Sequence, residues 1–300
     1  MINEYAVSPA LFNSIKDIAF LYGAFGVDHG RLISEYPRKG KWAEFARYFI
    51  KQNAKDDTEQ KKLMELLISL ANRSLYQRQG AQWDDGKDWI GNAIDENERR
   101  IFRGILNHES VVDSREVLTI GDTCLVTHWN NPPSISVPRK SVEMVRASIP
   151  LIHLSGTLVL IERNFEPADA RFTKVLVEFA KQILGQTHQP KITQIKYVTT
   201  YEGDRSSSRT KEKFEQECRE NLSHILPLGI SVKFIVKVKK LLHDRFVLTN
   251  RGCIQFGIGL DEGDGEVLIT RLSDKDFCNE WESWGKNSCH EFVIDGVRII

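Results

Sequence analysis

Apolar side chains recur at helical spacing through the first hundred or so residues. Ser8 and Pro9 precede a segment whose apolar residues fall on one helical stripe: Leu11, Ile15, Ile18, Ala19 and Tyr22. Further amphipathic segments follow at 41–50, 59–75 and about 89–106. This pattern predicts a mainly helical region over residues 1–110.

The pattern changes near residue 111. Residues 114–128 alternate between apolar and polar and are rich in β-branched side chains, which predicts two short strands around a turn at Gly121-Asp122. Residues 130–134 read as a loop, and residues 138–146 as a short helix or an extended arm. We therefore expect short strands and a linker over 111–150, between the helical region and a second domain.

From residue 151 onward, apolar runs alternate with amphipathic segments. Strands are expected at 156–162, 192–200 and 230–239, with a hairpin formed by 246–249 and 253–258 and a final strand or tail at 292–300. Helices are expected at 169–184, 210–226 and 274–284. Such alternation favours a mixed sheet with helices packed on it. The expected fold class is thus α+β or α/β, with an α/β domain over 151–300.

The composition limits the classes of partner, cofactor and cell compartment that we expect. The 41 basic and 41 acidic residues give a formal net charge of zero, so a nucleic-acid surface must be a local patch. Five cysteines without a CxxC pair fit a reducing cytoplasm and predict no zinc site. The chain starts without a signal-peptide pattern and has no apolar run long enough for a membrane span. No glycine-rich phosphate loop is found, and no cofactor is expected.

The run from Leu241 to Asp261 holds the densest candidate chemistry. His243 and Arg245 are two residues apart after an apolar strand, and alternate residues of an extended strand share a face. Both side chains are therefore expected to project into one pocket. An imidazole beside a guanidinium suits a phosphate diester. The alternative is a hydrogen-bond network that only closes the end of the strand.

This run resembles the phospholipase D superfamily motif of His, any residue, Lys, four residues, Asp, six residues, Gly. The chain has His243, Arg245, Asn250 and Gly257 at that spacing, with arginine in place of lysine and asparagine in place of aspartate. It is most similar to the phospholipase D-like C-terminal domain of MIT-domain proteins and to bacterial relatives. The likeness spans about residues 150–285.

The resemblance implies roles for these residues. His243 would attack phosphorus or protonate the leaving oxygen, Arg245 would hold the phosphate oxygens, and Asn250 would complete the catalytic set. Because only one motif is present, a homodimer would supply the second histidine. Eukaryotic members of this branch are thought to bind membrane lipid, and the bacterial ones resemble components of antiviral defence systems.

Neighbouring residues extend the candidate site. A basic rim that draws in a phosphate backbone is predicted from Lys237, Lys239, Lys240 and Arg251, and the alternative is the solvated face of an edge strand. Gly257 and Gly259 predict a close approach of the backbone beside the histidine. The acidic stretch 261–264 reads as a hairpin turn. The segment 36–42 is basic with interleaved aromatic residues, which is compatible with contact to nucleic acid or to a protein partner.

Three hypotheses follow from the sequence. The first is a bacterial antiviral-defence component that binds or cleaves nucleic-acid backbones around His243 and Arg245 as a metal-independent phosphodiesterase. The second is a non-catalytic adaptor that docks a larger ATPase or nuclease partner and keeps a degenerate pocket. The third is binding to anionic lipid, which the neutral charge disfavours. A partner subunit or a homodimer is expected in the first two.

Overall fold

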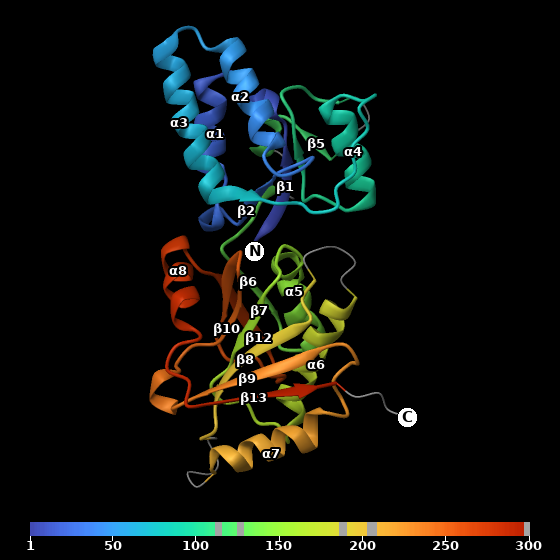
Figure 1. Cartoon of the computed structure of the whole chain (residues 1–300), viewed down its shortest axis with the longest axis vertical. Coiled ribbons are helices and arrows are strands. Elements are labelled where there is room, and N and C mark those ends of the chain that lie inside the picture. Colours follow the sequence, from blue (N-terminus) through green and yellow to red (C-terminus); the bar gives the residue numbers. More distant parts are fainter. Residues whose placement is uncertain (112–115, 125–128, 186–190, 203–208, 297–300) are drawn as a thin grey trace. The chain divides into compact units, whose positions relative to one another are not determined.

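The computed structural model describes residues 1–111, 116–124, 129–185, 191–202 and 209–296 (Figure 1). The chain divides into two compact units, residues 2–132 and residues 133–300 with Met1. The first unit has a five-stranded parallel sheet and the second an eight-stranded mixed sheet, so the protein is mixed α/β. No helix in the described ranges has the length and apolar character needed to cross a bilayer.

The sheet of the N-terminal unit has the strand order β3-β2-β1-β4-β5. Its strands are β1 (Asn3–Val7), β2 (Arg31–Ser34), β3 (Leu75–Tyr76), β4 (Ile105–Leu106) and β5 (Val117–Leu118). The chain runs outward from β1 to β3 on one side and then crosses to β4 and β5 on the other. The direction of winding therefore reverses between β1 and β4, which is where open α/β sheets bind ligands.

The helices of this unit are α1 (Ile15–Ala24), α2 (Lys41–Asn53), α3 (Asp57–Ser74) and α4 (Trp89–Arg99). The helices predicted near 41–50 and 59–75 are confirmed, whereas the one predicted over 89–106 ends at Arg99 and its last two residues form β4. Polar caps define three of the starts, because Ser14, Asp56 and Asp88 accept backbone N–H bonds from α1, α3 and α4. The segment predicted around 11–22 is divided into a 3-10 turn (Pro9–Asn13) and α1.

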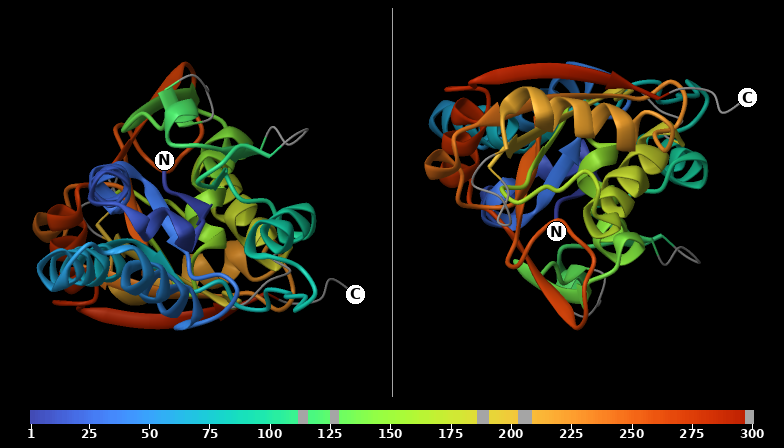
Figure 2. Two further views of the ribbon diagram at one scale, coloured as in Figure 1. Left: turned by 90° about the horizontal axis from the view of Figure 1, so that it is seen from above. Right: turned by 90° about the horizontal axis from the view of Figure 1, so that it is seen from below.

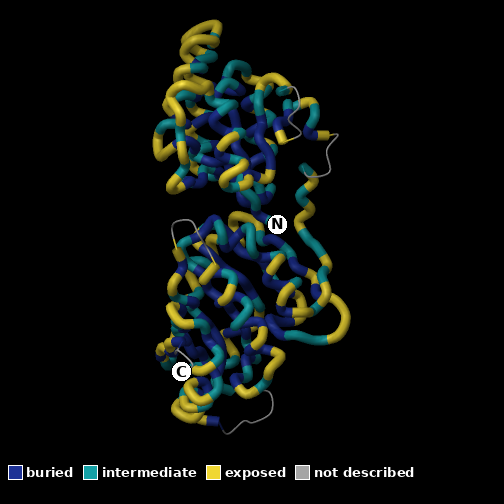
Figure 3. Tube along the Cα trace, turned by 90° about the vertical axis from the view of Figure 1, so that its right-hand side faces the viewer, coloured by how far each residue is buried: buried dark blue, intermediate teal, exposed yellow. Residues whose placement is uncertain are grey.

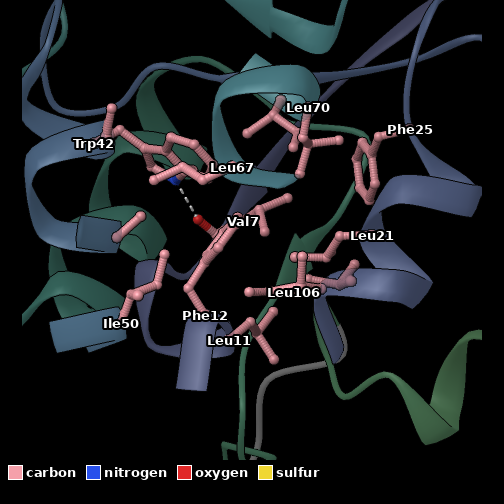
Figure 4. Close-up of a cluster of buried hydrophobic side chains, with 14 of the residues drawn as sticks. Val7, Leu11, Phe12, Leu21, Phe25, Trp42, Ile50, Leu67, Leu70 and Leu106 are labelled. Atoms are coloured by element: carbon pink, nitrogen blue, oxygen red, sulfur yellow. Dashed lines mark hydrogen bonds between the residues drawn. The ribbon is translucent and has the colours of Figure 1, made fainter. Parts of the chain in front are cut away.

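Successive residues of β1 serve the two faces of the sheet. Tyr5 and Val7 belong to the core formed with α1, α2 and α3, whereas Ala6 belongs to a second core on the side of α4. Figure 4 shows the larger core, in which the Trp42 indole Nε1–H donates to the Val7 carbonyl at 2.7 Å. Both faces of the short strands are thus covered, which is the usual setting of a parallel sheet.

The prediction of a mainly helical region over 1–110 is incomplete, because it finds the helices but misses β1 to β4. Those strands have between two and five residues, so no period-two pattern can develop along them. In the following stretch, the two strands predicted over 114–128 are represented by β5, while 112–115 and 125–128 lie outside the described residues. The turn expected at Gly121-Asp122 is a 3-10 turn, Gly121–Cys124.

A buried ion-pair network connects β1, the segment that follows β3, and α4. The Arg78 side chain has no exposure, and its Nε lies 2.8 Å from Glu96 Oε1 while its Nη1 lies 2.6 Å from Glu4 Oε2. The same guanidinium stacks 3.8 Å from the Phe102 ring centroid. A buried charge is tolerated only while its partners remain.

Replacing Glu96 with alanine should therefore destabilise the protein strongly. We expect the free energy of unfolding to fall by about 3–5 kcal/mol, because the Arg78 charge stays buried with half of its compensation removed. Urea denaturation measures this loss of stability. The control is Glu98→Ala, which replaces an exposed glutamate on the same helix. A loss equal to that of the control would contradict the importance of the network.

The sheet of the C-terminal unit has the order β13-β9-β8-β7-β10-β11-β12-β6. Its strands are β6 (Ser134–Pro138), β7 (Leu158–Ile161), β8 (Gln194–Thr200), β9 (Ser231–Lys237), β10 (Phe246–Thr249), β11 (Gly252–Phe256), β12 (Glu266–Arg271) and β13 (His290–Asp295). The three strands β7, β8 and β9 are mutually parallel, and the other pairings are antiparallel. The mixed sheet and the β10–β11 hairpin are as the sequence predicts.

Helices cover both faces of this sheet: α5 (Ser141–His153), α6 (Ala170–Leu184), α7 (Lys211–Leu222) and α8 (Asp274–Ser283). Val198 and Ile235 face the aromatic residues of α8, whereas Tyr197 and Phe234 face Phe165, which precedes α6, and the α7 ring Phe214. Figure 2 shows α8 and α6 on different sides of the strands. Strands β7 and β10 are buried along their whole length, and Figure 3 shows buried segments of the chain in the interior of the unit. The unit begins at Pro133 rather than 151, since β6 pairs with β12.

The order of the strands creates a second reversal point. The chain passes from β7 through α6 to β8 and through α7 to β9, and then returns to place β10 on the other side of β7. In the antiparallel register, Ile161 at the end of β7 lies opposite Phe246 at the start of β10. The next residues outward, Glu162 and Arg245, are consequently neighbours at the carboxyl end of β7.

Candidate anion-binding site

A polar cavity of about 240 Å³ lies at this end of β7. Its walls come from the residues that follow β6, β7 and β11, from the start of α6, and from the residue before β10. The lining residues are Arg139, Glu162, Asn164, Glu166, Asp169, Arg171, Phe172, Arg245, Ile258 and Asp261. All of them belong to the C-terminal unit, so the cavity is complete within one unit.

Glu162 is the most buried acid of the cavity, with 1 % of its surface exposed. Its two carboxylate oxygens accept backbone N–H bonds, from Leu260 at 2.7 Å and from Asn164 at 2.8 Å. Burial raises the pKa of this carboxyl above its ordinary value, although the two N–H bonds and the nearby Arg245 oppose the shift.

Arg245 projects a guanidinium whose hydrogen-bonding capacity is only partly used. Its Nη1 donates to the backbone carbonyl of His243 at 3.2 Å. Its buried Nε has no hydrogen-bond partner among the described residues and lies 3.8 Å from Glu162 Oε1, too far for a hydrogen bond. A buried guanidinium N–H without an acceptor is costly, so an acceptor supplied by a ligand would be favoured.

The other charges of the cavity largely satisfy one another. Asp261 pairs with Arg139, and its second oxygen lies 3.4 Å from Arg171 Nη1. Arg171 also bonds Asp169 at 3.0 Å. Outside the lining, Arg209 holds Glu166 at 2.6 Å. Among the described residues, two acids of the cavity lie beside an arginine with an unused buried donor: Glu162 beside Arg245 Nε and Glu166 beside Arg209 Nη2. Of these two arginines, Arg245 is the one that lines the cavity.

His243 does not share the cavity with Arg245. The histidine is exposed and is not one of the lining residues. The expectation that both side chains project into one pocket assumed an extended strand through residue 245. In the structure, residues 242–245 precede β10, and a 3-10 turn (Lys239–Leu241) separates them from β9.

Asn250 and Arg251 lie at the opposite end of β10, in the turn that leads to β11. The Asn250 side chain accepts the backbone N–H of Gly156 at 3.2 Å, just before β7 begins. The four residues of β10 separate Asn250 from Arg245, and five steps of extended chain correspond to roughly 16 Å. The structure thus gives Asn250 a bond at the far end of the strand.

The predicted basic rim is dispersed. Lys237 is buried at the end of β9, its Nζ lies 3.3 Å from the Ser283 carbonyl at the end of α8, and burial lowers its pKa. Lys239 and Lys240 belong to the 3-10 turn, and Lys240 is exposed. None of these lysines lines the cavity.

The two glycines differ in their surroundings. A Cβ at Gly259 would lie 2.5 Å from Asp261 Oδ1 and 3.3 Å from Glu162 Oε2, so the backbone approaches both acids closely. A Cβ at Gly257 would make ordinary contacts with Leu268, 3.5 Å from its carbonyl oxygen and 3.9 Å from its Cβ. The close approach expected from the sequence occurs at Gly259, next to carboxylates rather than next to His243.

Sequence reasoning missed most of the cavity. Arg139, Glu162 and Arg171 follow β6, follow β7 and begin α6, and nothing in their local pattern connects them. A charged residue directly after the buried run 158–161 was the available signal for Glu162. Asp261, which was assigned to a hairpin turn, is buried between two arginines.

In the described part of the chain, no group of three or more His, Cys, Asp or Glu side chains is arranged to hold a metal ion. No family model matches the sequence, and no curated protein matches it.

The raised pKa of Glu162 should appear in the pH dependence of stability. A carboxyl whose folded pKa exceeds its unfolded value of about 4.5 stabilises the fold most at low pH and loses that contribution as pH rises through the folded pKa. Glu162→Gln cannot titrate. The free energy of unfolding of the variant minus that of wild type should therefore increase from about pH 4 to about pH 8. Urea denaturation across this range measures it, and a constant difference would contradict the shift.

Gly259→Ala should damage the cavity where Gly257→Ala does not. The added methyl group at 259 forces the Asp261 or Glu162 carboxylate to move, and overpacking of this kind costs about 1–3 kcal/mol. The substitution at 257 has room and serves as the matched control. Urea denaturation of both variants tests this, and equal stabilities would show that the carboxylates adjust freely.

Proposed function

We propose that the C-terminal unit binds a phosphate group of a nucleic-acid backbone in the cavity beside Arg245. The observation that carries this proposal is the buried Arg245 Nε–H, which has no hydrogen-bond acceptor in the described part of the chain. A guanidinium is planar and rigid and matches phosphate oxygens well. The cavity of about 240 Å³ is smaller than typical pockets of roughly 300–1,000 Å³ for drug-sized ligands, which favours a compact group such as phosphate.

The charges of the cavity suit an anion whose binding depends on whether the Glu162 carboxyl is protonated. Asp261, Asp169 and Glu166 are each held by an arginine, so Glu162 is the acid that most directly opposes an anion at Arg245. Burial already favours its protonated form through the raised pKa. Protonation of Glu162 removes this opposing charge, so we expect anion affinity to rise as pH falls.

We further propose that the unit is a divergent phospholipase D-like module that binds phosphodiesters without cutting them. The motif spacing from His243 to Gly257 and the succession β7-α6-β8-α7-β9 before the motif support the likeness. The exposure of His243 outside the cavity supports binding over cleavage. On the resemblance, we propose a role in bacterial antiviral defence, in the cytoplasm, with a partner subunit or a second copy.

Arg245→Gln should weaken binding of labelled DNA or RNA by at least about tenfold, since a hydrogen bond to a charged group contributes about 1.5–3 kcal/mol. His243→Ala should leave affinity unchanged. Arg146→Gln, which removes an exposed arginine on α5, is the matched control. Fluorescence anisotropy in EDTA at several salt concentrations measures binding, and gel analysis of the same samples measures cleavage.

Two outcomes would overturn this proposal. Cleavage that His243→Ala abolishes would restore the phosphodiesterase hypothesis and point to a second histidine from another copy. Absence of nucleic-acid binding at low salt would favour the adaptor hypothesis, for which capture of the partner from the native host is the next step.

A further inference from the structure

A second and larger cavity, of about 500 Å³, lies in the N-terminal unit. It opens where β1 ends, at Ser8, and is enclosed by α2 and by the start of α4. The lining residues are Ser8, Pro9, Ala10, Glu44, Phe45, Tyr48, Phe49, Trp83, Lys87, Asp88 and Trp89. The cavity is therefore at the carboxyl edge of a parallel sheet, beside the strand from which the winding reverses, where mononucleotide-binding α/β units hold their ligands.

Two aromatic walls enclose this cavity. Phe45, Tyr48 and Phe49 come from α2, and Trp83 and Trp89 come from the loop before α4 and its first residue. The Phe45 and Trp83 rings are 6.1 Å apart at 32°, and Tyr48 is 58 % exposed although its ring borders the cavity. Flat aromatic faces on two elements suit a planar ring that stacks on them.

The polar groups of the cavity are chiefly acceptors. Ser8 is 4 % exposed, and Glu44 and Asp88 supply carboxylates, of which Glu44 pairs with Lys41 at 2.8 Å and Asp88 accepts the Gly91 N–H at 2.8 Å. Lys87 is the one cation of the lining, and it is engaged by Asp95 at 2.5 Å. A ligand here needs N–H donors on its edge and an apolar face, as the amino-substituted nucleobases have.

A basic segment adjoins the aromatic walls. Arg38 and Lys39 are exposed between β2 and α2, and neither has an ion-pair partner among the residues that the structure describes. Lys41, at the first position of α2, has its Nζ 5.2 Å from the Phe45 ring centroid and 2.8 Å from Glu44 Oε1, so Arg38 and Lys39 are the cations of this segment without an ion pair in the described residues. Cations next to the stacking surface are suited to the phosphate that accompanies a base.

We propose that the cavity of the N-terminal unit binds an unpaired nucleobase, with the attached phosphate held by the segment Arg38–Lys41. The ligand is either a mononucleotide or one nucleotide of a single strand, because both present the same base and phosphate. Base-paired nucleic acid does not fit, since its bases are stacked and their edges are occupied. This site is separate from the cavity beside Arg245 and does not depend on the function proposed there.

The experiment uses the full-length Arg245→Gln protein, so that the phosphate cavity of the other unit is disabled in every sample. Calorimetry and anisotropy measure binding of adenosine, adenosine monophosphate, a single-stranded oligoadenylate and the same strand in a duplex. Tyr48→Ala in this background should weaken binding of the unpaired ligands by about tenfold, the effect of losing one stacking contact. Ile68→Ala, which removes an equally exposed side chain from α3, is the matched control.

Tighter binding of the oligoadenylate than of the mononucleotide would identify a single strand as the ligand, and the reverse would identify the free nucleotide. The inference is overturned if none of these ligands binds, if Tyr48→Ala binds as the control does, or if the duplex binds as well as the single strand. Binding of tetramethylammonium without nucleotide binding would also overturn it, in favour of an aromatic cage for organic cations.

Discussion

The antiparallel pairing of β7 with β10 is the constraint on which the candidate anion site depends. It sets a buried glutamate beside an arginine at the end of two strands that are fully covered on both faces. A shift of one residue in this register would turn each side chain to the other face of the sheet, away from the residues it packs against. The chemistry of the site is therefore fixed by the same packing that stabilises the sheet.

The sequence predicts the C-terminal unit well, because its strands and helices are long enough to show their periods. The apolar run at 158–161 correctly predicts the strand β7, and the amphipathic pattern at 170–184 correctly predicts the helix α6. The capping role of Thr210 at the start of α7 is also predicted correctly from the sequence. In the N-terminal unit, strands of two to five residues leave no period, so a parallel sheet was interpreted as loops between helices.

The candidate site was harder to predict than the fold, because its residues meet only through the sheet. Arg245 was found from its motif, and Gly259 from its place in a glycine pair. Arg139 and Asp261 are bonded but 122 residues apart in the chain, and no local pattern announces such a pair. His243 was misplaced because the strand begins three residues later than the same-face argument required.

The distribution of the anion-site residues along the chain has a consequence for synthesis. The first lining residue in the chain, Arg139, follows β6, and the last, Asp261, follows β11. Most of the unit must therefore leave the ribosome before the cavity can form. A nascent or truncated chain carries the individual charged residues without the enclosure that makes them selective. The cavity therefore cannot form before the chain as far as Asp261 has been synthesised.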